Sequence, residues 1–304
     1  MTVARRETFG EKLGFAAFRG YTALVQSLSL DRASDLGGAI GRTFGPLSPT
    51  DQVARRNMRL AFPGMSRAEE DRLIRAMWDN LGRLAGEFPH LGSIEPFSGD
   101  DRISFERLDL LDAWRDGGRP VVFVSGHFAN WELMPMTIAR RGVVCQMTYR
   151  PANNPYVDDW IVAERARYGT RLFAPKGAAG GRELLKALGR GEAVAIMNDQ
   201  KYNTGLAVPL FGHDAMTADA PTRLALQFDA ILAPMSVVRT SGARFRVICH
   251  EPIDFDRSLP KEEAVRAGVT AINRFIEDRI RAHPDQWFWV HRRWPKDAWA
   301  KAGV

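Results

Sequence analysis

The pattern of apolar and polar residues changes near residue 120 and divides the chain into two regions. Up to residue 115, apolar residues recur every three or four positions, which is the period of an α-helix. One helix is expected to begin at Ser66, because Ser66-Arg-Ala-Glu69 has the pattern of a capping box. The apolar residues after it keep the helical spacing: Leu73, Ile74, Met77 and Leu81. We therefore expect residues 1–115 to form a helical N-terminal region.

Short runs of apolar and β-branched residues dominate from residue 120 onward. Five of these runs predict strands: Val121–Ser125, Val143–Tyr149, Ala193–Met197, Ile231–Val238 and Phe245–Cys249. Helical stretches lie between or after them: Val157–Arg167, Gly181–Leu188, Ala220–Phe228 and Lys261–Ala282. Strands that alternate with helices indicate a largely parallel sheet covered on both faces. The predicted fold class is α/β, a three-layer sandwich with a mostly parallel (mixed) central sheet; residues 116–304 form its α/β core, in one structural unit with the helical N-terminal region.

The composition is that of an ordinary globular protein. Of 304 residues, 45% are hydrophobic and 26% charged, which excludes a disordered or collagen-like chain. Cys145 and Cys249 lack metal-binding spacing and are expected to be core residues of a protein from a reducing compartment. The formal net charge of +6 favours anionic partners. No nucleic-acid recognition motif or concentrated basic block is present, so no nucleic acid is expected among them.

The most apolar stretch, Leu13–Leu30, is interrupted by Arg19 and Gln26 before it reaches the roughly 18–20 apolar residues of a spanning helix. Some of its apolar residues recur at helical spacing: Phe18, Tyr21, Val25 and Leu28. An amphipathic helix with flanking cations suits a bilayer surface, and it equally suits packing against its own domain. The sequence leaves these two alternatives open. Glu7 and Glu11 interrupt the start of any secretory signal, so the protein is expected to stay in the cytoplasm.

The segment Pro120–Leu133 carries the strongest candidate chemistry. It reads Pro-Val-Val-Phe-Val-Ser-Gly-His-Phe-Ala-Asn-Trp-Glu-Leu, so His127 stands where a buried strand ends and Glu132 follows five residues later. Ligand and catalytic groups of open α/β sheets collect at the carboxyl ends of strands. His90 and Glu95 have the same spacing but no strand before them, so the context separates the two pairs.

Helical geometry restricts how His127 and Glu132 could cooperate. Five residues of an ideal helix leave two side chains about 140° apart, so His127 must lie in the turn and Glu132 in the first helical turn. Glu132 would then accept a hydrogen bond from one imidazole nitrogen and leave the other free to take a proton. The alternative is a structural histidine with Glu132 as a charge at a helix N-terminus.

The rest of the chain supplies no competing nucleophile motif. We find no Gly-x-Ser-x-Gly, no phosphate-binding Gly-x-x-x-x-Gly-Lys, no Cys-x-x-Cys and no His-Glu-x-x-His. A histidine–carboxylate pair without a nucleophile fits direct transfer, in which the histidine activates the acceptor's own hydroxyl. We therefore expect no metal and no cofactor.

Taken together, the motifs resemble a known family, the late acyltransferases of lipid A biosynthesis (the lauroyl and myristoyl transferases), within the lysophospholipid acyltransferase superfamily. The resemblance covers nearly the whole chain. It rests on blocks in a fixed order: Arg56–Pro63, Asn80–Arg83 with Glu87, His127–Glu132, Tyr149–Pro155, Arg171–Gly177, Asn198–Gln200, Val208–Gly212 and Gln286–Trp294. Two departures, His213 and the run Met216–Pro221 in place of a Thr-x-Thr-Gly-Pro-like sequence, leave the choice of acceptor and acyl chain in doubt.

The resemblance implies roles for individual residues. It makes His127 the general base and Glu132 its charge partner. The remaining candidates are substrate-binding residues: Arg150, Asp199, Gln200, Asn130 and Lys176. Asp199 and Gln200 follow a predicted strand at the same sheet edge as His127, and an arginine such as Arg150 suits a phosphate. The structural alternatives are a surface salt bridge for Arg150, a helix cap for Asp199 and a solvated side chain for Lys176.

The tryptophans of the C-terminal block are expected to be core residues that alternate with the surface charges Arg292 and Arg293 along a strand. A contact with lipid is the less favoured alternative for these tryptophans: Trp287, Trp289 and Trp294.

The activity that the resemblance implies is transfer of a fatty acyl chain from an acyl-thioester to a hydroxyl of a lipid A precursor. The expected partners are acyl carrier protein as donor, with coenzyme A as the alternative, an anionic glycolipid acceptor and a membrane surface. The expected place is the cytoplasmic face of the inner membrane, as a peripheral or monotopic protein. Two other functions stay open: acylation of another membrane lipid (a phosphoinositide mannoside, an aminolipid or a lysophospholipid), and a catalytically inactive lipid-binding protein.

Overall fold

The computed structural model describes residues 8–170, 173–175 and 178–304. Its N-terminal part is helical, as predicted: α1 (Phe9–Gln26), α2 (Leu30–Phe44), α3 (Asp51–Ala61) and α4 (Arg67–Glu87), with the short 3₁₀ turns η1 (Gly45–Leu47) and η2 (Phe88–Ser93). The side chain of Ser66 accepts a hydrogen bond from the backbone N–H of Glu69, which confirms Ser66 as the N-cap of α4.

Helices α2 and α4 are in close contact because glycines line their crossing. A Cβ atom at Gly82 would lie 2.1 Å from the backbone oxygen of Gly37, and one at Gly41 would lie 2.1 Å from the oxygen of Trp78. Only glycine lets the two backbones approach to this distance. The glycines thereby let α2 and α4 pack as a closely joined pair.

A seven-stranded sheet forms the centre of the molecule, in the order β1-β9-β8-β2-β5-β3-β4. Its strands are β1 (Ile103–Glu106), β2 (Val121–Ser125), β3 (Cys145–Tyr149), β4 (Phe173–Pro175), β5 (Ala193–Met197), β8 (Ile231–Ser241) and β9 (Arg244–Cys249). Only the β8–β9 pair is antiparallel among these described strands. The mixed, mostly parallel sheet confirms the predicted fold class.

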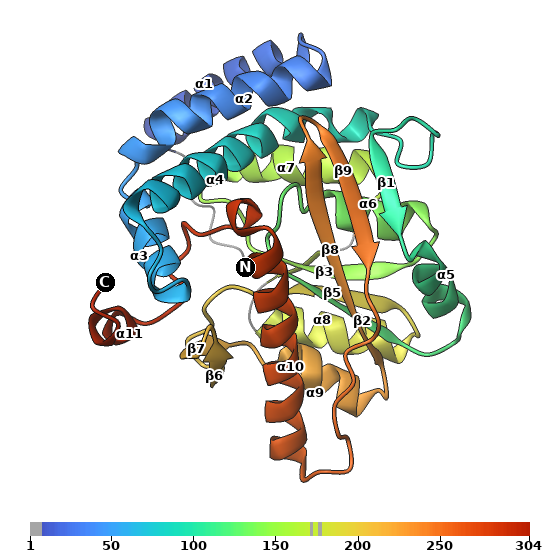
Figure 1. Ribbon diagram of the computed structural model, residues 1–304. Coiled ribbons are helices and arrows are strands. Elements are labelled where there is room, and N and C mark those ends of the chain that lie inside the picture. Colours follow the sequence, from blue (N-terminus) through green and yellow to red (C-terminus); the bar gives the residue numbers. More distant parts are fainter. Residues whose placement is uncertain (1–7, 171–172, 176–177) are drawn as a thin grey trace.

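Helices cover both faces of this sheet. Figure 1 shows α6 (Leu133–Arg140) and α7 (Pro155–Arg167) above the parallel strands, and α8 (Ala178–Gly189) and α9 (Ala220–Gln227) below them. A further helix, α5 (Leu108–Asp116), lies near the β1 edge. The long α10 (Lys261–Ala282) packs against a separate hairpin of β6 (Leu206–Leu210) and β7 (His213–Thr217).

All five predicted strands are present, but four others were not predicted. The short β1 lies in the region expected to be helical, so the sheet begins before residue 116. The edge strand β4 and the β6–β7 hairpin were also missed. Cys145 and Cys249 are buried and free, as expected.

The C-terminal segment does not form the expected strand. After the 3₁₀ turn η3 (Pro284–Gln286), only Trp287 makes a single antiparallel bridge, to Phe128, before α11 (Lys296–Lys301). All three tryptophans are buried in the core, as predicted, but Arg293 is buried as well and is not a surface charge. Its guanidinium donates to the Met216 oxygen and to Thr217 Oγ1, and it thereby ties the tail to β7.

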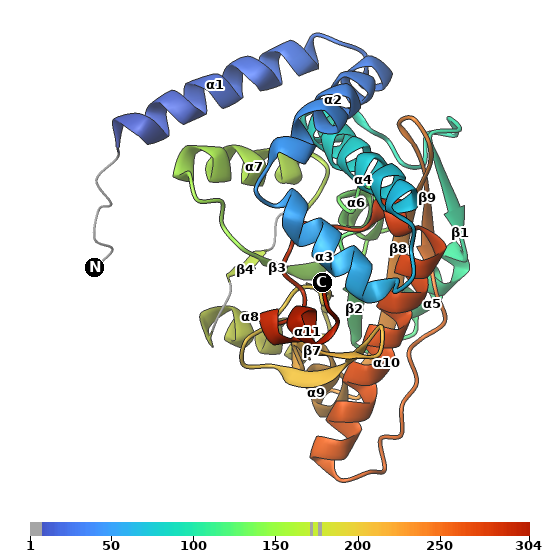
Figure 2. The same ribbon diagram turned by 60° about the vertical axis from the view of Figure 1, so that its left-hand side comes forward.

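Helix α1 extends along the outside of α7 (Figure 2). Phe15 stacks on Tyr156 with ring centroids 5.4 Å apart, and Phe18 contacts Trp160 edge-on at 5.0 Å. The apolar positions noted in the sequence therefore face the protein, with Val25 fully buried. None of the helices in the described part of the chain has both the length and the apolar character that crossing a bilayer requires.

Candidate active site

The register between β2 and β5 places two candidate site residues side by side. The strands are parallel, and Ser125 pairs with Met197 at their carboxyl ends. His127 and Asp199 each lie two residues beyond the last residue of their strand. Gly126 makes this approach possible, because a Cβ atom at that position would lie 2.8 Å from the Phe128 ring and 3.2 Å from Asp199 Oδ2.

The carboxylate of Asp199 holds His127 at two points. The distance between His127 Nδ1 and Asp199 Oδ1 is 2.7 Å, and the backbone N–H of His127 donates to Oδ2 at 2.7 Å. Burial works to raise the pKa of Asp199, but the charge and hydrogen bonds of His127 outweigh it and lower this pKa to about 2. Asp199 is therefore an anion at neutral pH, and Nε2 is the ring nitrogen that remains for chemistry.

Glu132 lies at the start of the helix, near its expected place, but its carboxylate does not bind the imidazole. It is the N-cap residue of α6, and its buried carboxylate accepts hydrogen bonds from Arg165 Nε at 2.9 Å and from Arg165 Nη2 at 2.5 Å, together with one from Tyr168. The hydrogen bond expected between Glu132 and the imidazole is replaced by that of Asp199. The reason is geometric: the α6 cap directs this carboxylate toward α7, whereas the carboxyl end of β5 lies directly beside the turn of His127.

The electrostatics of Glu132 nevertheless include the imidazole. Burial acts to raise the pKa of Glu132, but Arg165 and Tyr168 lower it overall, and the charge of His127 contributes to the lowering. Arg165 in turn lies over the ring of Tyr149, 4.8 Å from its centroid. Glu132 therefore fixes the partly buried guanidinium of Arg165 in α7 and adds negative potential near His127.

Two aromatic rings flank the imidazole. Trp131 meets it edge-on with ring centroids 5.0 Å apart, and Phe288 lies at 5.9 Å. The side chain of His127 is 19% exposed, so the ring is partly shielded from solvent and still accessible.

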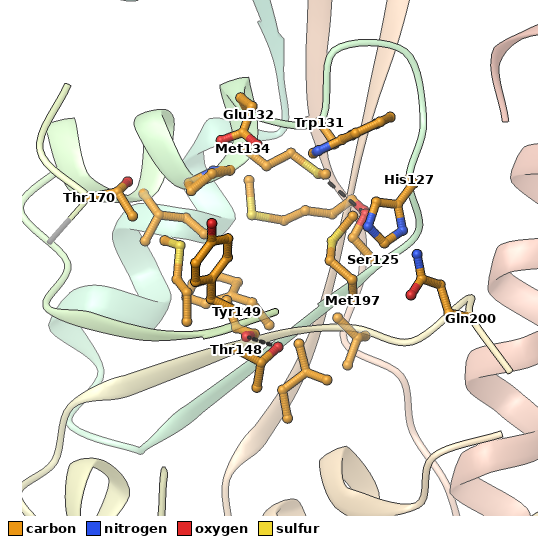
Figure 3. A pocket seen from close by; sticks show the side chains of 18 of the residues that line it. Ser125, His127, Trp131, Glu132, Met134, Thr148, Tyr149, Thr170, Met197 and Gln200 are labelled. Carbon is orange, nitrogen blue, oxygen red and sulfur yellow. Dashed lines mark hydrogen bonds between the residues drawn. The ribbon is translucent and has the colours of Figure 1, made fainter. Parts of the chain in front are cut away.

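His127 lines one end of a cavity of about 440 Å³ between the sheet and α6 (Figure 3). The figure shows His127 and Gln200 on one side and Thr170 on the opposite side, with methionine side chains between them. The apolar lining comes mainly from these residues: Phe123, Met134, Ile138, Met147, Met197 and Met235. A cavity of this kind accommodates a flexible hydrocarbon chain.

The structure brings some of the other predicted site residues to this cavity and not all of them. Arg150 and Gln200 line it, and Arg150 is exposed at the surface. Asn130 does not line it: its side chain is fully buried and donates to Glu87 Oε2 at 2.9 Å. Lys176 lies outside the described residues.

Several residues of the site were not predicted to belong to it. Arg165 and Tyr168 hold Glu132, and Phe288 contacts the imidazole ring. Trp287 donates from its indole Nε1 to Asp199 Oδ2 at 2.8 Å. The only local signal for Phe288 and Trp287 was the dense aromatic C-terminal block, and the sequence does not show which residues this block packs against.

No group of three or more His, Cys, Asp or Glu side chains suited to a metal ion occurs in the part of the chain that the structure describes. The site consists of a buried carboxylate, a partly exposed imidazole and an apolar cavity. In an α/β protein these features suit an enzyme site, in which the imidazole is placed to take a proton beside a bound apolar chain.

The match to a family model makes this class specific. Residues 11–296 match the model of the bacterial lipid A biosynthesis acyltransferases, so the chain belongs to this family and is an acyltransferase. The predicted family is thus confirmed.

Named relatives agree with this assignment. The chain is 28% identical to the lipid A biosynthesis palmitoleoyltransferase of Escherichia coli K12, over 84% of this chain and 81% of the relative. It is 26% identical to the lipid A biosynthesis lauroyltransferase of the same organism, over 80% and 78%. It is also 22% identical to the phosphatidylinositol mannoside acyltransferase of Mycolicibacterium smegmatis, over 98% and 96%.

Proposed function

We propose that this acyltransferase moves a fatty acyl chain from a thioester to a hydroxyl of a lipid A precursor, with His127 as the general base. The observation that carries the proposal is the arrangement of His127: Nδ1 faces the buried carboxylate of Asp199, and the ring lines an apolar cavity. Such a cavity suits the acyl chain, and the imidazole is placed where the thioester of that chain would lie.

The proposed reaction is a direct transfer without a protein-bound intermediate. His127 Nε2 takes the proton of the acceptor hydroxyl while its oxygen attacks the thioester carbonyl. The tetrahedral intermediate expels the thiolate, which receives the proton from the imidazolium, so the products are an ester and a thiol. Asp199 orients the ring with the proton on Nδ1 and stabilises the imidazolium. Glu132 adds negative potential nearby and holds Arg165 in the wall of the cavity.

Arg150 and Gln200 are the proposed substrate contacts at the cavity. The exposed guanidinium of Arg150 suits a phosphate of the acceptor or of the donor's pantetheine arm. The proposed donor is acyl carrier protein, because the net charge of +6 would attract an acidic carrier. Coenzyme A is the alternative donor.

A membrane surface is proposed as the place of reaction, at the cytoplasmic face of the inner membrane. The face of α1 opposite to its contact with α7 carries an exposed stripe without charges: Phe9, Leu13, Ala16, Ala17, Gly20 and Leu24. The cations Lys12 and Arg19 lie beside this stripe and suit anionic lipid head groups. The two alternatives for this helix thus combine: one face packs on the protein and the other is available to a bilayer.

A second acceptor is favoured by one relative. The similarity to a phosphatidylinositol mannoside acyltransferase spans almost the whole chain, so a mannosylated phosphoinositide is the alternative acceptor. Both acceptors offer a hydroxyl on an anionic glycolipid, and the same base would serve either.

Purified protein with an acyl-thioester and each acceptor tests the proposal. We expect the lipid A precursor to gain the mass of one acyl chain, with faster turnover for acyl carrier protein than for coenzyme A. His127→Ala should lower turnover at least ~100-fold with the fold intact, the loss typical of removing a general base. Near-normal transfer by this folded variant would refute the assignment of the base, and a mass gain only on the mannoside would identify the other acceptor.

A further inference from the structure

A third hydrogen bond reaches the carboxylate that holds His127, and it comes from the far end of the chain. The indole Nε1 of Trp287 donates to Asp199 Oδ2 at 2.8 Å. We propose that Trp287 is a positioning residue of this site, whose N–H fixes the Asp199 carboxylate so that Oδ1 faces Nδ1 of His127. The same hydrogen bond weakens the electrostatic attraction between this carboxylate and the imidazolium. This inference rests on the proposed function of His127.

The backbone around Trp287 is fixed to the turn that carries His127. Phe128 and Trp287 form an antiparallel bridge, and the N–H of Ala129 donates to the oxygen of Gln286 at 2.8 Å. Ala129 has a φ of 44°, a left-handed conformation that an alanine adopts only when its surroundings enforce it. The C-terminal segment and the histidine turn therefore act as one rigid unit.

The hydrogen bonds of Asp199 explain why this donor matters. Oδ2 accepts from the backbone N–H of His127 and from Trp287, while Oδ1 faces the imidazole. Two donors on Oδ2, from different directions, prevent the carboxylate from rotating. Without the indole N–H, only the backbone N–H of His127 would hold Oδ2, and the carboxylate would lose its fixed plane.

The same donor also tunes the charge of the pair. A hydrogen bond to a carboxylate stabilises its anionic form and reduces the negative potential that it presents to other groups. Loss of the indole N–H would leave more negative potential at Oδ1, and the imidazolium would then keep its proton up to a higher pH. Among the described residues, the other charged or titratable groups that line the same cavity are Glu132, Arg165, Arg150, His291 and Tyr149, and they are unchanged by this substitution.

A neighbouring tryptophan provides a matched control. Trp289 is equally buried and contacts Trp287 with ring centroids 4.6 Å apart, but its Nε1 donates to the oxygen of Pro284 at 2.6 Å and not to Asp199. Replacing either indole by a phenyl ring removes one N–H and a similar volume from the same cluster. Only the substitution at position 287 removes a donor from Asp199.

We therefore compare Trp287→Phe with Trp289→Phe by turnover, by KM for the donor and by melting temperature. Both variants should lose stability to a similar degree. Trp287→Phe should also lower kcat ~10-fold or more at unchanged KM, the effect of losing a hydrogen bond to a charged group. The acid-side fall of its activity should move to higher pH, and Trp289→Phe should keep the wild-type profile.

If Trp287→Phe folds poorly, an isosteric replacement and an NMR titration test the proposal in its place. Incorporation of benzothienylalanine at position 287 replaces the N–H by sulfur in a ring of nearly the same shape. The titration of the His127 ring, followed by NMR of ¹³C-labelled histidine and assigned with His127→Gln, should then shift to higher pH. This shift needs no substrate, so it tests Trp287 even where acyl transfer itself is not observed.

The outcomes separate the two proposals. If the isostere titrates as the wild type does, or if Trp287→Phe and Trp289→Phe have the same kcat and pH profile, Trp287 is a packing residue and the inference is wrong. If His127→Ala keeps its turnover while the isostere shifts the titration of His127, the inference about Trp287 holds. In that case the proposal that His127 is the general base is wrong.

Discussion

Replacement of Asp199 by asparagine separates the two carboxylates that compete for the role of imidazole partner. The hydrogen bonds determine how the amide would fit. Its oxygen can take the place of Oδ2, where it accepts from the backbone N–H of His127 and from Trp287. Its NH₂ group then faces Nδ1, which must become an acceptor, and the ring proton moves to Nε2. The opposite orientation would set NH₂ against two N–H donors, at a cost of about 1–3 kcal/mol for each unsatisfied donor.

Asp199→Asn should therefore fold well and be a poor catalyst. With the proton on Nε2 the imidazole cannot take another from the acceptor, and a loss of kcat of about 10²- to 10⁴-fold is expected, as for other histidine–carboxylate pairs with an inverted tautomer. Glu132→Gln should show the opposite pattern, with a large loss of stability and a smaller loss of kcat. It leaves the Arg165 guanidinium without its counter-charge, and breaking such a buried pair costs about 3–5 kcal/mol of unfolding free energy.

The assay measures kcat with acyl carrier protein thioester and a lipid A precursor in mixed micelles, together with the unfolding free energy of each variant. The ¹⁵N shifts of the His127 ring report its tautomer. Because the pKa of Asp199 is lowered to about 2, this residue stays ionised throughout the accessible pH range, and any fall of activity between pH 4 and 8 must come from another group. If Glu132→Gln loses as much kcat as Asp199→Asn while it keeps its stability, Glu132 is the functional partner and our interpretation is wrong.

Three further predictions concern stability and membrane binding. Burial lowers the pKa of His250 from 6.5 to about 4, so its contribution to stability is complete above pH 6.5 and is lost as the pH falls to 4. This contribution amounts to about 3 kcal/mol. In His250→Asn, the unfolding free energy measured with urea should therefore depend less on pH over that interval. Gly82→Ala should lower the melting temperature by several degrees, because the new Cβ atom would lie 2.1 Å from the Gly37 oxygen, and an unchanged melting curve would contradict the close helix crossing. Leu24→Ser should weaken sedimentation with anionic vesicles by ~10-fold, since about 1.5 kcal/mol of apolar burial is lost, whereas the equally exposed control Val144→Ser should bind as the wild type does.

The sequence predicted those parts of the fold whose signal is local. β2 and β5 are short apolar runs that the core buries, so their bounds were found from residue type alone. Helix α10 has the predicted limits, Lys261–Ala282, because its apolar period is regular and Pro284 follows it. The short edge strand β1 was missed, since four residues with alternating burial carry too little pattern to be told from a loop.

The partner of His127 required information that is not local. Both candidate carboxylates were found, and Asp199 was placed at the correct sheet edge. The choice between them depends on the register of β2 and β5, which are 72 residues apart at the two side chains, and on the direction that the α6 cap gives to Glu132. A spacing of five residues favoured Glu132, but tertiary contacts between distant segments determined the outcome.

The burial of Arg293 is a second case in which contacts between distant segments, and not the local sequence, determine the structure. An arginine next to a tryptophan is ordinarily a surface residue beside a core residue, and this pattern gave the prediction of a strand with alternating sides. Here the tail runs through the interior, where Met216, Thr217 and Asn273 accept the hydrogen bonds of its guanidinium. Burial lowers the pKa of Arg293 to about 10, although the charge of Asp199 opposes this. These acceptors come from two elements far from the tail in sequence, β7 and α10, and cannot be seen in any window of the sequence.

The proposed base and the cavity wall are held by different parts of the structure. His127 and Asp199 follow central, fully paired strands, so displacing them requires opening the core of the sheet, which is the most stable unit of such a fold. The α7 side of the cavity is held instead by the Glu132–Arg165 ion pair and by aromatic contacts with α1. If the acyl chain binds in this cavity as proposed, substitutions in α7 and α1 should change which chain it accepts without moving the imidazole.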